Sequence, residues 1–259
     1  MNRQLALGAS RLVAAGTSVL ALVAMAGCSA GGAESGEGED FGPSASHEPA
    51  PGEFVSVEQE AAEAAEQNKI ICNPLATTYR GSVTLANGLW GDWAECPQLC
   101  PTGSFAWGIS LERDGPANSG SIAGPGDDTA VDGLRLTCKT PSGVTTGTVT
   151  SQLGPFGFAG FGDNPMCPAG SPLRGGRVQF EAAQGSGDDT AVNNINGNCA
   201  NNTNIYPHPL TNWGTMGAWA ICPAGQMVCG LRTRVEWDQG PIDDDTTLNG
   251  VRFACCTYP

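Results

Sequence analysis

The sequence predicts an all-β domain in which three short sheets surround a common axis. Three observations predict this fold. The 37 glycines and 18 prolines make up more than a fifth of the 259 residues, a composition that favours short strands joined by turns. A block of three motifs occurs three times within residues 67–259. The chain also contains 11 cysteines, as expected of an exported domain that disulfides staple together.

The first 27 residues have the pattern of a secretory signal. Arg3 and Arg11 accompany an apolar run over residues 12–26, which is shorter than the roughly 20 apolar residues of a comfortable membrane span. The run ends in Ala-Gly-Cys28, which resembles the lipobox of bacterial lipoproteins. We therefore expect a lipoprotein-type signal at 1–27 and lipidation of Cys28, with the protein anchored to a membrane of the cell envelope or extracellular. The alternative is an ordinary signal peptide cut near Ala26.

Residues 28–66 are expected to form an acidic, disordered tether. The stretch contains ten acidic residues and no Lys or Arg, and it has too few large apolar residues to offset the entropy of ordering. Residues 58–66 are compatible with a short exposed helix. The net charge of the whole chain is −14, which disfavours nucleic acid and anionic membrane surfaces as partners.

The repeated block is the clearest signal in the sequence. An Asp-Asp-Thr motif occurs at 126–131, 187–192 and 243–248. A Cys-Pro-x-Gly turn precedes each copy, beginning at Cys100, Cys167 and Cys222, and a cysteine follows each copy. Paired tryptophans precede the first and third turns, whereas Phe156, Phe158 and Phe161 precede the second. The domain at 67–259 therefore divides into units at about 83–143, 144–202 and 203–259.

Strand-like segments lie between these landmarks. Residues 105–112, 177–181 and 230–237 alternate apolar and polar side chains, or nearly so, between turn-rich segments. Each unit is long enough for about four short strands, the content of one sheet. A single sheet of this size cannot bury its apolar face alone, whereas three sheets around an axis can.

The motifs resemble those of the vitelline membrane outer layer protein I family. The resemblance covers about residues 80–259. It rests on Trp90-Gly91-Asp92-Trp93, on Cys100 with residues 126–138, and on residues 222–236 and 244–256 with the terminal Cys255-Cys256 pair. It implies a β-prism of three four-stranded antiparallel sheets related by a pseudo-threefold axis. It also implies a secreted, structural protein with a reported ability to bind or transfer N-acetylglucosamine oligosaccharides.

The cysteines are expected to form five disulfides. Eleven is an odd number, and Cys28 as the lipid acceptor leaves ten. The repeats pair each turn cysteine with the cysteine after the Asp-Asp-Thr motif of the same unit. In the third unit two cysteines precede the motif and two follow it, so their order stays open. The working assignment is Cys100–Cys138, Cys167–Cys199, Cys222–Cys255, Cys229–Cys256 and the remaining Cys72–Cys96. With His208 as the single histidine of the domain, we expect no metal site and no cofactor.

The Asp-Asp-Thr motifs are interpreted as structural turns. Their aspartates are Asp127, Asp128, Asp188, Asp189, Asp244 and Asp245. Aspartate and threonine side chains cap backbone N–H groups where a strand begins, and a motif repeated in every unit is more typical of architecture than of catalysis. Calcium binding is an alternative, although one short turn offers few ligands. Glycosidic acid–base chemistry is another, and it needs two carboxylates held in different environments.

The tryptophan-bearing segments are the candidate ligand site. Flat aromatic rings beside polar groups can stack on sugars, and the candidate residues are Trp90, Asp92, Trp93, Asn212, Trp213 and Trp219. The competing interpretation is that these rings fill the core or the ends of the prism. Trp107 and Trp237 lie on predicted strands and are assigned to packing.

The sequence favours a non-catalytic, lipid-anchored surface module that binds glycan or another envelope component as a monomer. The motivation is the export signal, the tether, the disulfides and the lack of a catalytic constellation. The alternatives are a weak carbohydrate-active enzyme, a transferase or hydrolase using Asp92, Glu112 or Glu236, and a purely structural coat protein.

Overall fold

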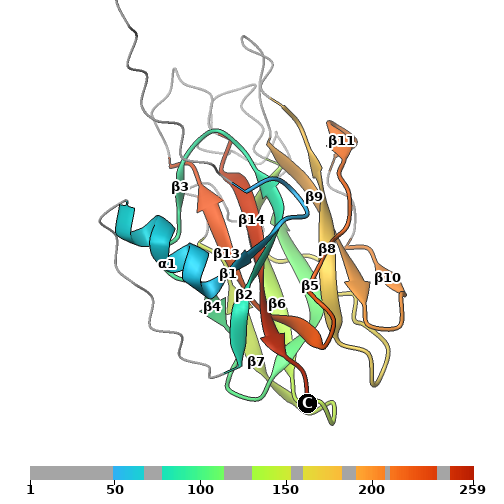
Figure 1. Cartoon of the computed structure of the whole chain (residues 1–259). Coiled ribbons are helices and arrows are strands. Elements are labelled where there is room, and N and C mark those ends of the chain that lie inside the picture. Colours follow the sequence, from blue (N-terminus) through green and yellow to red (C-terminus); the bar gives the residue numbers. More distant parts are fainter. Residues whose placement is uncertain are drawn as a thin grey trace, which may run out of the picture. The chain divides into compact units, whose positions relative to one another are not determined.

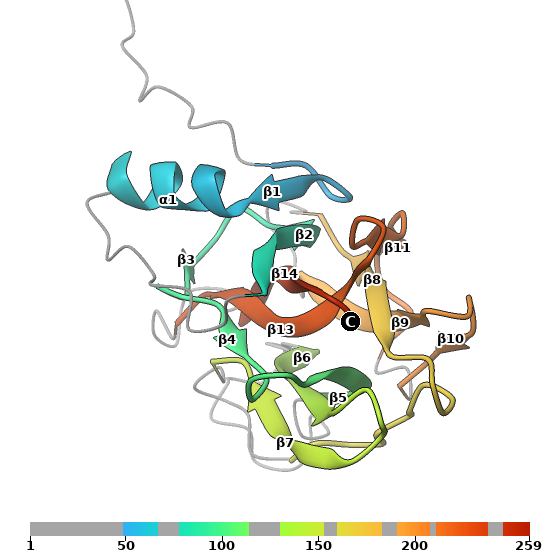
Figure 2. The same ribbon diagram turned by 60° about the horizontal axis from the view of Figure 1, so that its bottom comes forward.

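The computed structural model describes residues 49–66, 78–113, 130–152, 160–182, 191–207, 211–237 and 246–259. Within them, three antiparallel sheets face one another (Figure 1). Seen closer to the direction of the strands, the sheets surround a shared interior (Figure 2). This arrangement confirms the predicted all-β β-prism.

Each sheet is built on one long antiparallel pair. In the first sheet β5 (Phe105–Arg113) pairs with β6 (Val131–Lys139), and β7 (Thr145–Thr150) lies at the edge. In the second, β8 (Leu173–Phe180) pairs with β9 (Val192–Cys199), and β10 (Asn204–Ile205) lies at the edge. In the third, β13 (Gln226–Val235) pairs with β14 (Leu248–Thr257), which in turn pairs with β2 (Tyr79–Asn87).

A short, broken edge strand completes each sheet. In the β13–β14 sheet it consists of β3 (Asp92–Trp93) and β4 (Gln98–Leu99), both paired with β13. In the β8–β9 sheet it consists of β11 (Thr215–Met216) and β12 (Ala220–Ile221), both paired with β8. In the β5–β6 sheet two isolated bridges, Gly108 to Met166 and Glu112 to Phe161, take this place.

The broken edge of each sheet comes from another repeat than its central strands, and the repeats follow one another in cyclic order. The aromatic segment of the second unit joins the β5–β6 sheet, that of the third joins the β8–β9 sheet, and that of the first joins β13. The sheets therefore do not coincide with the expected units 83–143, 144–202 and 203–259. Because β2 also pairs with the C-terminal strand β14, the two ends of the domain close the ring.

The apolar core lies where the inner faces of the three sheets meet. One continuous buried cluster includes Leu85 of β2, Ile109 of β5, Ile195 of β9 and Phe253 of β14. Two glycines show how tightly the sheets approach. A Cβ at Gly197 would lie 2.8 Å from Ile109 Cδ1, and a Cβ at Gly176 would lie 2.8 Å from Phe253 Cε2. Close packing of this kind is typical of a protein interior.

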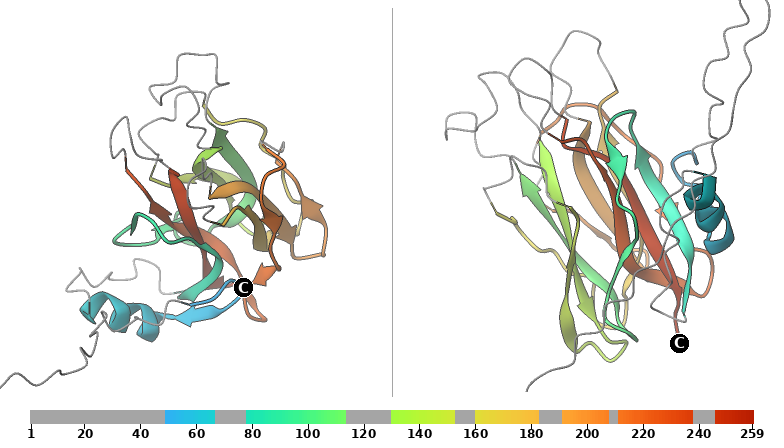
Figure 3. Two further views of the ribbon diagram at one scale, coloured as in Figure 1. Left: turned by 90° about the horizontal axis from the view of Figure 1, so that it is seen from above. Right: turned by 90° about the vertical axis from the view of Figure 1, so that its left-hand side faces the viewer.

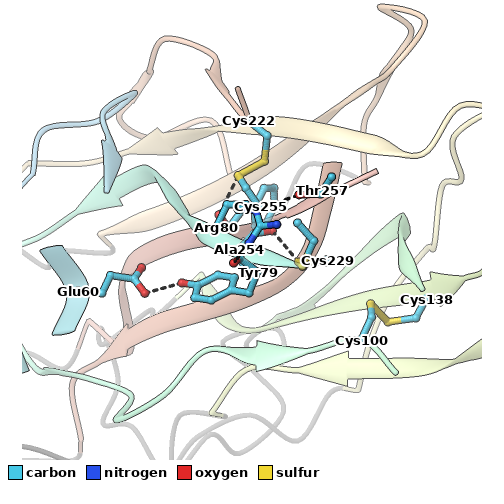
Figure 4. Close-up of a disulfide and its surroundings, with 12 residues drawn as sticks. Glu60, Tyr79, Arg80, Cys100, Cys138, Cys222, Cys229, Ala254, Cys255 and Thr257 are labelled. Atoms are coloured by element: carbon cyan, nitrogen blue, oxygen red, sulfur yellow. Dashed lines mark hydrogen bonds between the residues drawn. A yellow bond between two sulfur atoms is a disulfide. The ribbon is translucent and has the colours of Figure 1, made fainter. Parts of the chain in front are cut away.

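The disulfides link strands at one end of the sheets. The structure contains Cys100–Cys138, Cys167–Cys199, Cys222–Cys255 and Cys229–Cys256. These are the pairs that the repeats predict, and the structure selects the working order in the third unit (Figure 4). Cys96 is also disulfide-bonded. Cys72 and Cys28 lie outside the described residues, so Cys72–Cys96 stays a prediction, as does lipidation of Cys28.

The prediction of a disordered tether over residues 28–66 is wrong for residues 54–66, which form a strand and a helix. Strand β1 (Phe54–Ser56) pairs with β2, and helix α1 (Val57–Glu66) follows it directly. The helix begins with a capping box, in which Gln59 N donates to Ser56 Oγ at 3.3 Å and Ser56 N donates to Gln59 Oε1 at 2.9 Å. The pairing of β1 with β2 and the helix cap together offset the entropy lost when residues 54–66 become ordered. The composition of this segment does not reveal either contribution. Figure 3 shows α1 on the outer side of β2.

Candidate functional site

The predicted ligand residues divide between two sheets. Asp92 and Trp93 form β3 at the edge of the β13–β14 sheet, and Trp90 belongs to the turn before it. Asn212, Trp213 and Trp219 flank β11 at the edge of the β8–β9 sheet. In Figure 1, β3 and β11 lie on different sides of the domain. The six residues therefore do not form one continuous binding surface.

Two of the predicted aromatic rings stack on arginines. The Arg252 guanidinium lies 4.5 Å from the centre of the Trp93 ring, and the Arg177 guanidinium lies 4.5 Å from that of Trp219. In the β5–β6 sheet, Arg135 lies 4.1 Å from the Phe161 ring in the same way. An arginine thus lies over an aromatic ring of the broken edge in each of the three sheets. The packing interpretation therefore accounts for Trp93 and Trp219.

Trp213 differs because its side chain is 43% exposed. Side chains of the β8–β9 sheet hold the backbone around it. Gln179 Nε2 donates to Trp213 O at 2.6 Å, and Asn194 Nδ2 donates to Thr211 O at 2.9 Å. Gly214 follows with φ +73°, a conformation that glycine adopts without strain. The result is an exposed indole on a fixed turn, with the exposed Asn212 beside it.

A second set of exposed apolar side chains lies at the end of the β13–β14 sheet. Arg234 fixes the turn before β3, because its guanidinium donates to Gly88 O at 2.8 Å and to Gly91 O at 2.9 Å. Leu89 in this turn is exposed, and so is Trp237 just beyond β13. The prediction that Trp107 packs inside is confirmed, whereas the same prediction for Trp237 is wrong, since β13 ends at Val235 and Trp237 is 52% exposed.

Phe180 connects the two turns. A Cβ at Gly88 would lie 3.1 Å from Phe180 Cζ, and a Cβ at Gly214 would overlap the Phe180 backbone. The two turns therefore both approach Phe180, one at its ring and the other at its backbone, at the same end of the prism. This end is opposite the disulfides, which lie where β5, β8 and β13 begin. Sequence reasoning missed the supporting residues Gln179, Asn194 and Arg234, because they lie far along the chain from the aromatic residues.

The three candidate carboxylates occupy different environments. Asp92 is exposed on β3. Glu236 is buried and accepts hydrogen bonds from Thr246 N at 3.2 Å and Thr246 Oγ1 at 2.6 Å, which gives it a structural role. Glu112 is buried on the β5–β6 sheet, and its Oε2 has no hydrogen-bond partner among the described residues. Burial raises the pKa of the Glu112 carboxyl, and Arg135 opposes the rise. Glu112 and Glu236 belong to different sheets and do not form a catalytic pair.

The Asp-Asp-Thr aspartates lie outside the described residues, but the strand entries beside them are described. Ala130, Ala191 and Thr247 occupy equivalent positions in the three repeats, and all three have positive φ, between 48° and 58°. All three are buried. A left-handed, buried residue thus occurs at the same place in every unit, as the interpretation of these motifs as structural turns expects.

The described residues contain no group of three or more His, Cys, Asp or Glu arranged to hold a metal ion. Among the same residues, no helix combines the length and the apolar character that crossing a membrane requires.

The family model and the curated relatives that match this chain point to the same family. Residues 83–258 match the family model described as vitelline membrane outer layer protein I. A vitelline membrane outer layer protein 1 homolog of Mus musculus is 39% identical over 181 residues, covering 69% of this chain and 84% of the mouse protein. The Homo sapiens homolog is 38% identical over 173 residues, covering 66% of this chain and 80% of the human protein.

Two solved lectin structures resemble the domain more distantly. The Calystegia sepium agglutinin is 14% identical, with a TM-score of 0.37, and the match covers 66% of this chain and 99% of the agglutinin. A mannose-specific jacalin-related lectin from Morus nigra is 11% identical, with a TM-score of 0.41, and the match covers 71% of this chain and 98% of the lectin. No ligand is inferred for this chain from either structure.

Proposed function

This chain belongs to the vitelline membrane outer layer protein I family, and on that premise we propose that it is a non-catalytic, carbohydrate-binding module of an extracellular or envelope layer. The observation that carries the proposal is the exposed Trp213 on its fixed turn. Sugar rings stack on flat aromatic faces, and neighbouring amides bond their hydroxyl groups. Asn212 supplies such an amide.

The rigidity of the turn supports binding rather than chance exposure. Gln179, Asn194 and Gly214 restrict the backbone on both sides of Trp213. A preorganised ring loses little entropy when a ligand arrives. No ionisable group is needed for this recognition, which suits a module that holds a glycan without transforming it.

The disulfides support a location outside the reducing cytoplasm, since such bonds form and persist in oxidising compartments. The relatives are named for an outer layer of the vitelline membrane, which suits a coat component. Lipid anchoring through Cys28 is part of the same proposal. In a bacterial host, Cys28→Ala is expected to shift the protein from the membrane fraction to the soluble fraction. An unchanged distribution would exclude the anchor.

Binding of the purified, oxidised chain to a glycan panel tests the proposal. The panel contains chitooligosaccharides, peptidoglycan fragments and neutral polysaccharides, with and without calcium. We expect saturable binding to one sugar class that Trp213→Ala weakens at least about tenfold, the loss of about 1.4 kcal/mol.

Tyr206→Ala is the matched control. Tyr206 is 55% exposed and follows β10, at the edge of the same sheet opposite β11 and β12. Its loss should leave glycan binding unchanged. Equal loss in both variants would indicate a non-specific effect of aromatic area, and no binding across the panel would exclude the glycan proposal.

A weak carbohydrate-active enzyme is the second candidate, because Glu112 is a carboxyl whose pKa burial raises. A general acid needs such a carboxyl. Hydrolysis of chitooligosaccharide by the wild type, lost in a folded Glu112→Gln variant, would favour this candidate over the binding module.

A further inference from the structure

Strand β1 is an extra strand on the β13–β14 sheet. Without it, this sheet consists of β2, β14, β13 and the broken edge of β3 and β4, which is the composition of the β8–β9 sheet with its edge strand β10. The family match begins at residue 83, whereas α1 ends at Glu66. Figure 2 shows β1 and α1 outside β2. The β1–α1 segment, residues 54–66, is therefore an addition to a sheet that is complete without it.

Apolar side chains attach this segment to the domain. Val55 of β1 is buried, and Phe54 packs against the main core cluster. Val57, the first residue of α1, packs against a second buried cluster that contains Tyr79 and Cys256. A ten-residue helix is only marginally stable by itself. These contacts with the domain therefore hold the segment in place.

The polar contacts of the segment all go to β2. Glu60 of α1 accepts hydrogen bonds from the Tyr79 hydroxyl and from Ser82 Oγ, the latter at 2.5 Å (Figure 4). Before β1, Gly52 N donates to Thr84 O at 2.7 Å. Strand β2 thus supplies both a backbone edge and side chains that hold the segment, which is the mode of peptide recognition by strand addition.

Gly81 shapes the β2 edge for this segment. It is the register partner of Ser56 and has φ +135°, a conformation that glycine adopts readily. A Cβ at Gly81 would lie 2.1 Å from Val55 O and 2.9 Å from Ser56 Cα. The missing side chain therefore lets β1 lie against β2.

The linker between the segment and β2 is long. Residues 67–78 join α1 to β2, and at full extension a linker of this length spans roughly 40 Å. The diameter of a small domain is about 30 Å. The segment can therefore reach the β2 edge of a second copy of the chain, and no covalent bond has to change for this exchange.

We propose that copies of this chain assemble by strand exchange, in which the β1–α1 segment of one copy occupies the β2 edge of a second copy. The contacts are the same within one copy and between two copies, so the concentration of copies decides between them. At low concentration each segment lies on its own β2 edge. In a crowded surface layer, exchange links neighbouring copies. This interface does not use the Trp213 turn and goes beyond the proposed glycan binding.

Two complementary variants of the full chain test the proposal. Val55→Asp releases the segment, because a carboxylate at this buried position is costly, and it leaves the β2 edge intact. Gly81→Val blocks the edge, because the new side chain collides with Val55 O, and it leaves the segment intact. An equimolar mixture should form a complex of one copy of each variant. We expect its Kd, measured by analytical ultracentrifugation, to be at least about tenfold below that for self-association of either variant.

Val144→Asp is the matched control for Val55→Asp. It makes the same substitution at a valine that is 62% exposed, between β6 and β7, so the segment stays on its own β2 edge. Its mixture with Gly81→Val should remain monomeric at the concentration where the test mixture associates. Adding Trp213→Ala to Val55→Asp should leave the complex unchanged. A monomeric mixture of folded Val55→Asp and Gly81→Val overturns the proposal.

A cross-link between two copies tests the exchange without Gly81→Val, should that variant fail to fold. Val55 and Ser82 are direct partners in the register. Such partners have Cα atoms about 4.5–5.5 Å apart, within the range that a disulfide bridges. Concentrated Val55→Cys and Ser82→Cys chains, mixed in a glutathione redox buffer, should form a covalent dimer with one copy of each.

Peptide mapping by mass spectrometry should find the link of this dimer between positions 55 and 82. Val55→Cys mixed with Tyr206→Cys is the matched control, because Tyr206 is exposed and follows β10 in another sheet. A dimer linked through positions 55 and 82, in excess of the control, supports exchange. A yield no greater than that of the control overturns it.

Discussion

The Arg252 guanidinium lies 4.5 Å from the centre of the Trp93 ring, beneath an edge strand contributed by a different repeat. The same relationship joins Arg177 to Trp219 and Arg135 to Phe161. Each stack attaches the broken edge of a sheet to the strands that the preceding unit supplies. The three stacks thus link the units around the ring, and this role distinguishes the packed aromatic residues from the exposed Trp213.

Trp219→Ala and Trp213→Ala should have different effects on stability. Trp219 is partly buried and stacked on Arg177, so its removal is expected to lower the free energy of unfolding by about 1–3 kcal/mol. Trp213→Ala should change it by less than about 0.5 kcal/mol, since the ring is exposed and stacks on no arginine of the described part of the chain. Urea denaturation of the two variants measures the difference. Equal losses would contradict the division of the aromatics into packed and exposed groups.

Gly214→Ala should disturb the fixed turn beside Trp213. Gly214 has φ +73°, and a Cβ there would overlap the Phe180 backbone. We expect a loss of about 2 kcal/mol or more in the free energy of unfolding, from strain and from displacement of the turn. Gly170→Ala is the matched control, because Gly170 has φ +75° but no atom within 4 Å of a Cβ. Strain alone should cost about 1 kcal/mol there. Thermal unfolding of both variants checks the contrast.

Stability should depend on pH through Glu112. Burial raises the pKa of its carboxyl in the folded state, so the folded state binds more protons than the unfolded state between the two pKa values. The free energy of unfolding therefore falls as the pH rises from the ordinary glutamate range through the higher folded value. Glu112→Gln removes this dependence, and the variant should gain stability relative to wild type at pH 7 but not at pH 4. The exposed Glu53→Gln serves as control, and a gain that is equal at both pH values would contradict the prediction.

Removing one disulfide should lower the stability of the domain without displacing the candidate site. The Cys167–Cys199 bond closes a loop with a sequence separation of 32, and the chain-entropy relation gives about 3–4 kcal/mol for a loop of this size. The double variant Cys167→Ala/Cys199→Ala should lose about that much stability in urea. Where it remains folded, glycan binding at Trp213 should persist, because the bond lies at the other end of the sheet. Lost binding in a folded variant would contradict this separation.

The predicted fold was recoverable from the sequence because its signals are local and repeated. A turn cysteine, a strand, an Asp-Asp-Thr motif and a second cysteine recur in one order, and this order predicts both the central strand pairs and their disulfides. The capping box at Ser56 and Gln59 is also local, and it was readable in the acidic segment. Composition alone favoured disorder there, because the pairing of β1 with β2 and the hydrogen bonds of Glu60 join residues that lie far apart in the sequence.

The sequence by itself determined the all-β repeat architecture and the cysteine pairs of the first two units, because each depends on spacing within one unit. Only the tertiary structure decided which sheet each aromatic segment joins, since a repeated motif is compatible with pairing to its own unit or to a neighbouring one. That choice sets the exposure of each ring. Trp93 and Trp213 both lie within two residues of a glycine in the sequence, yet the edge pairing stacks Trp93 on Arg252 and leaves Trp213 exposed.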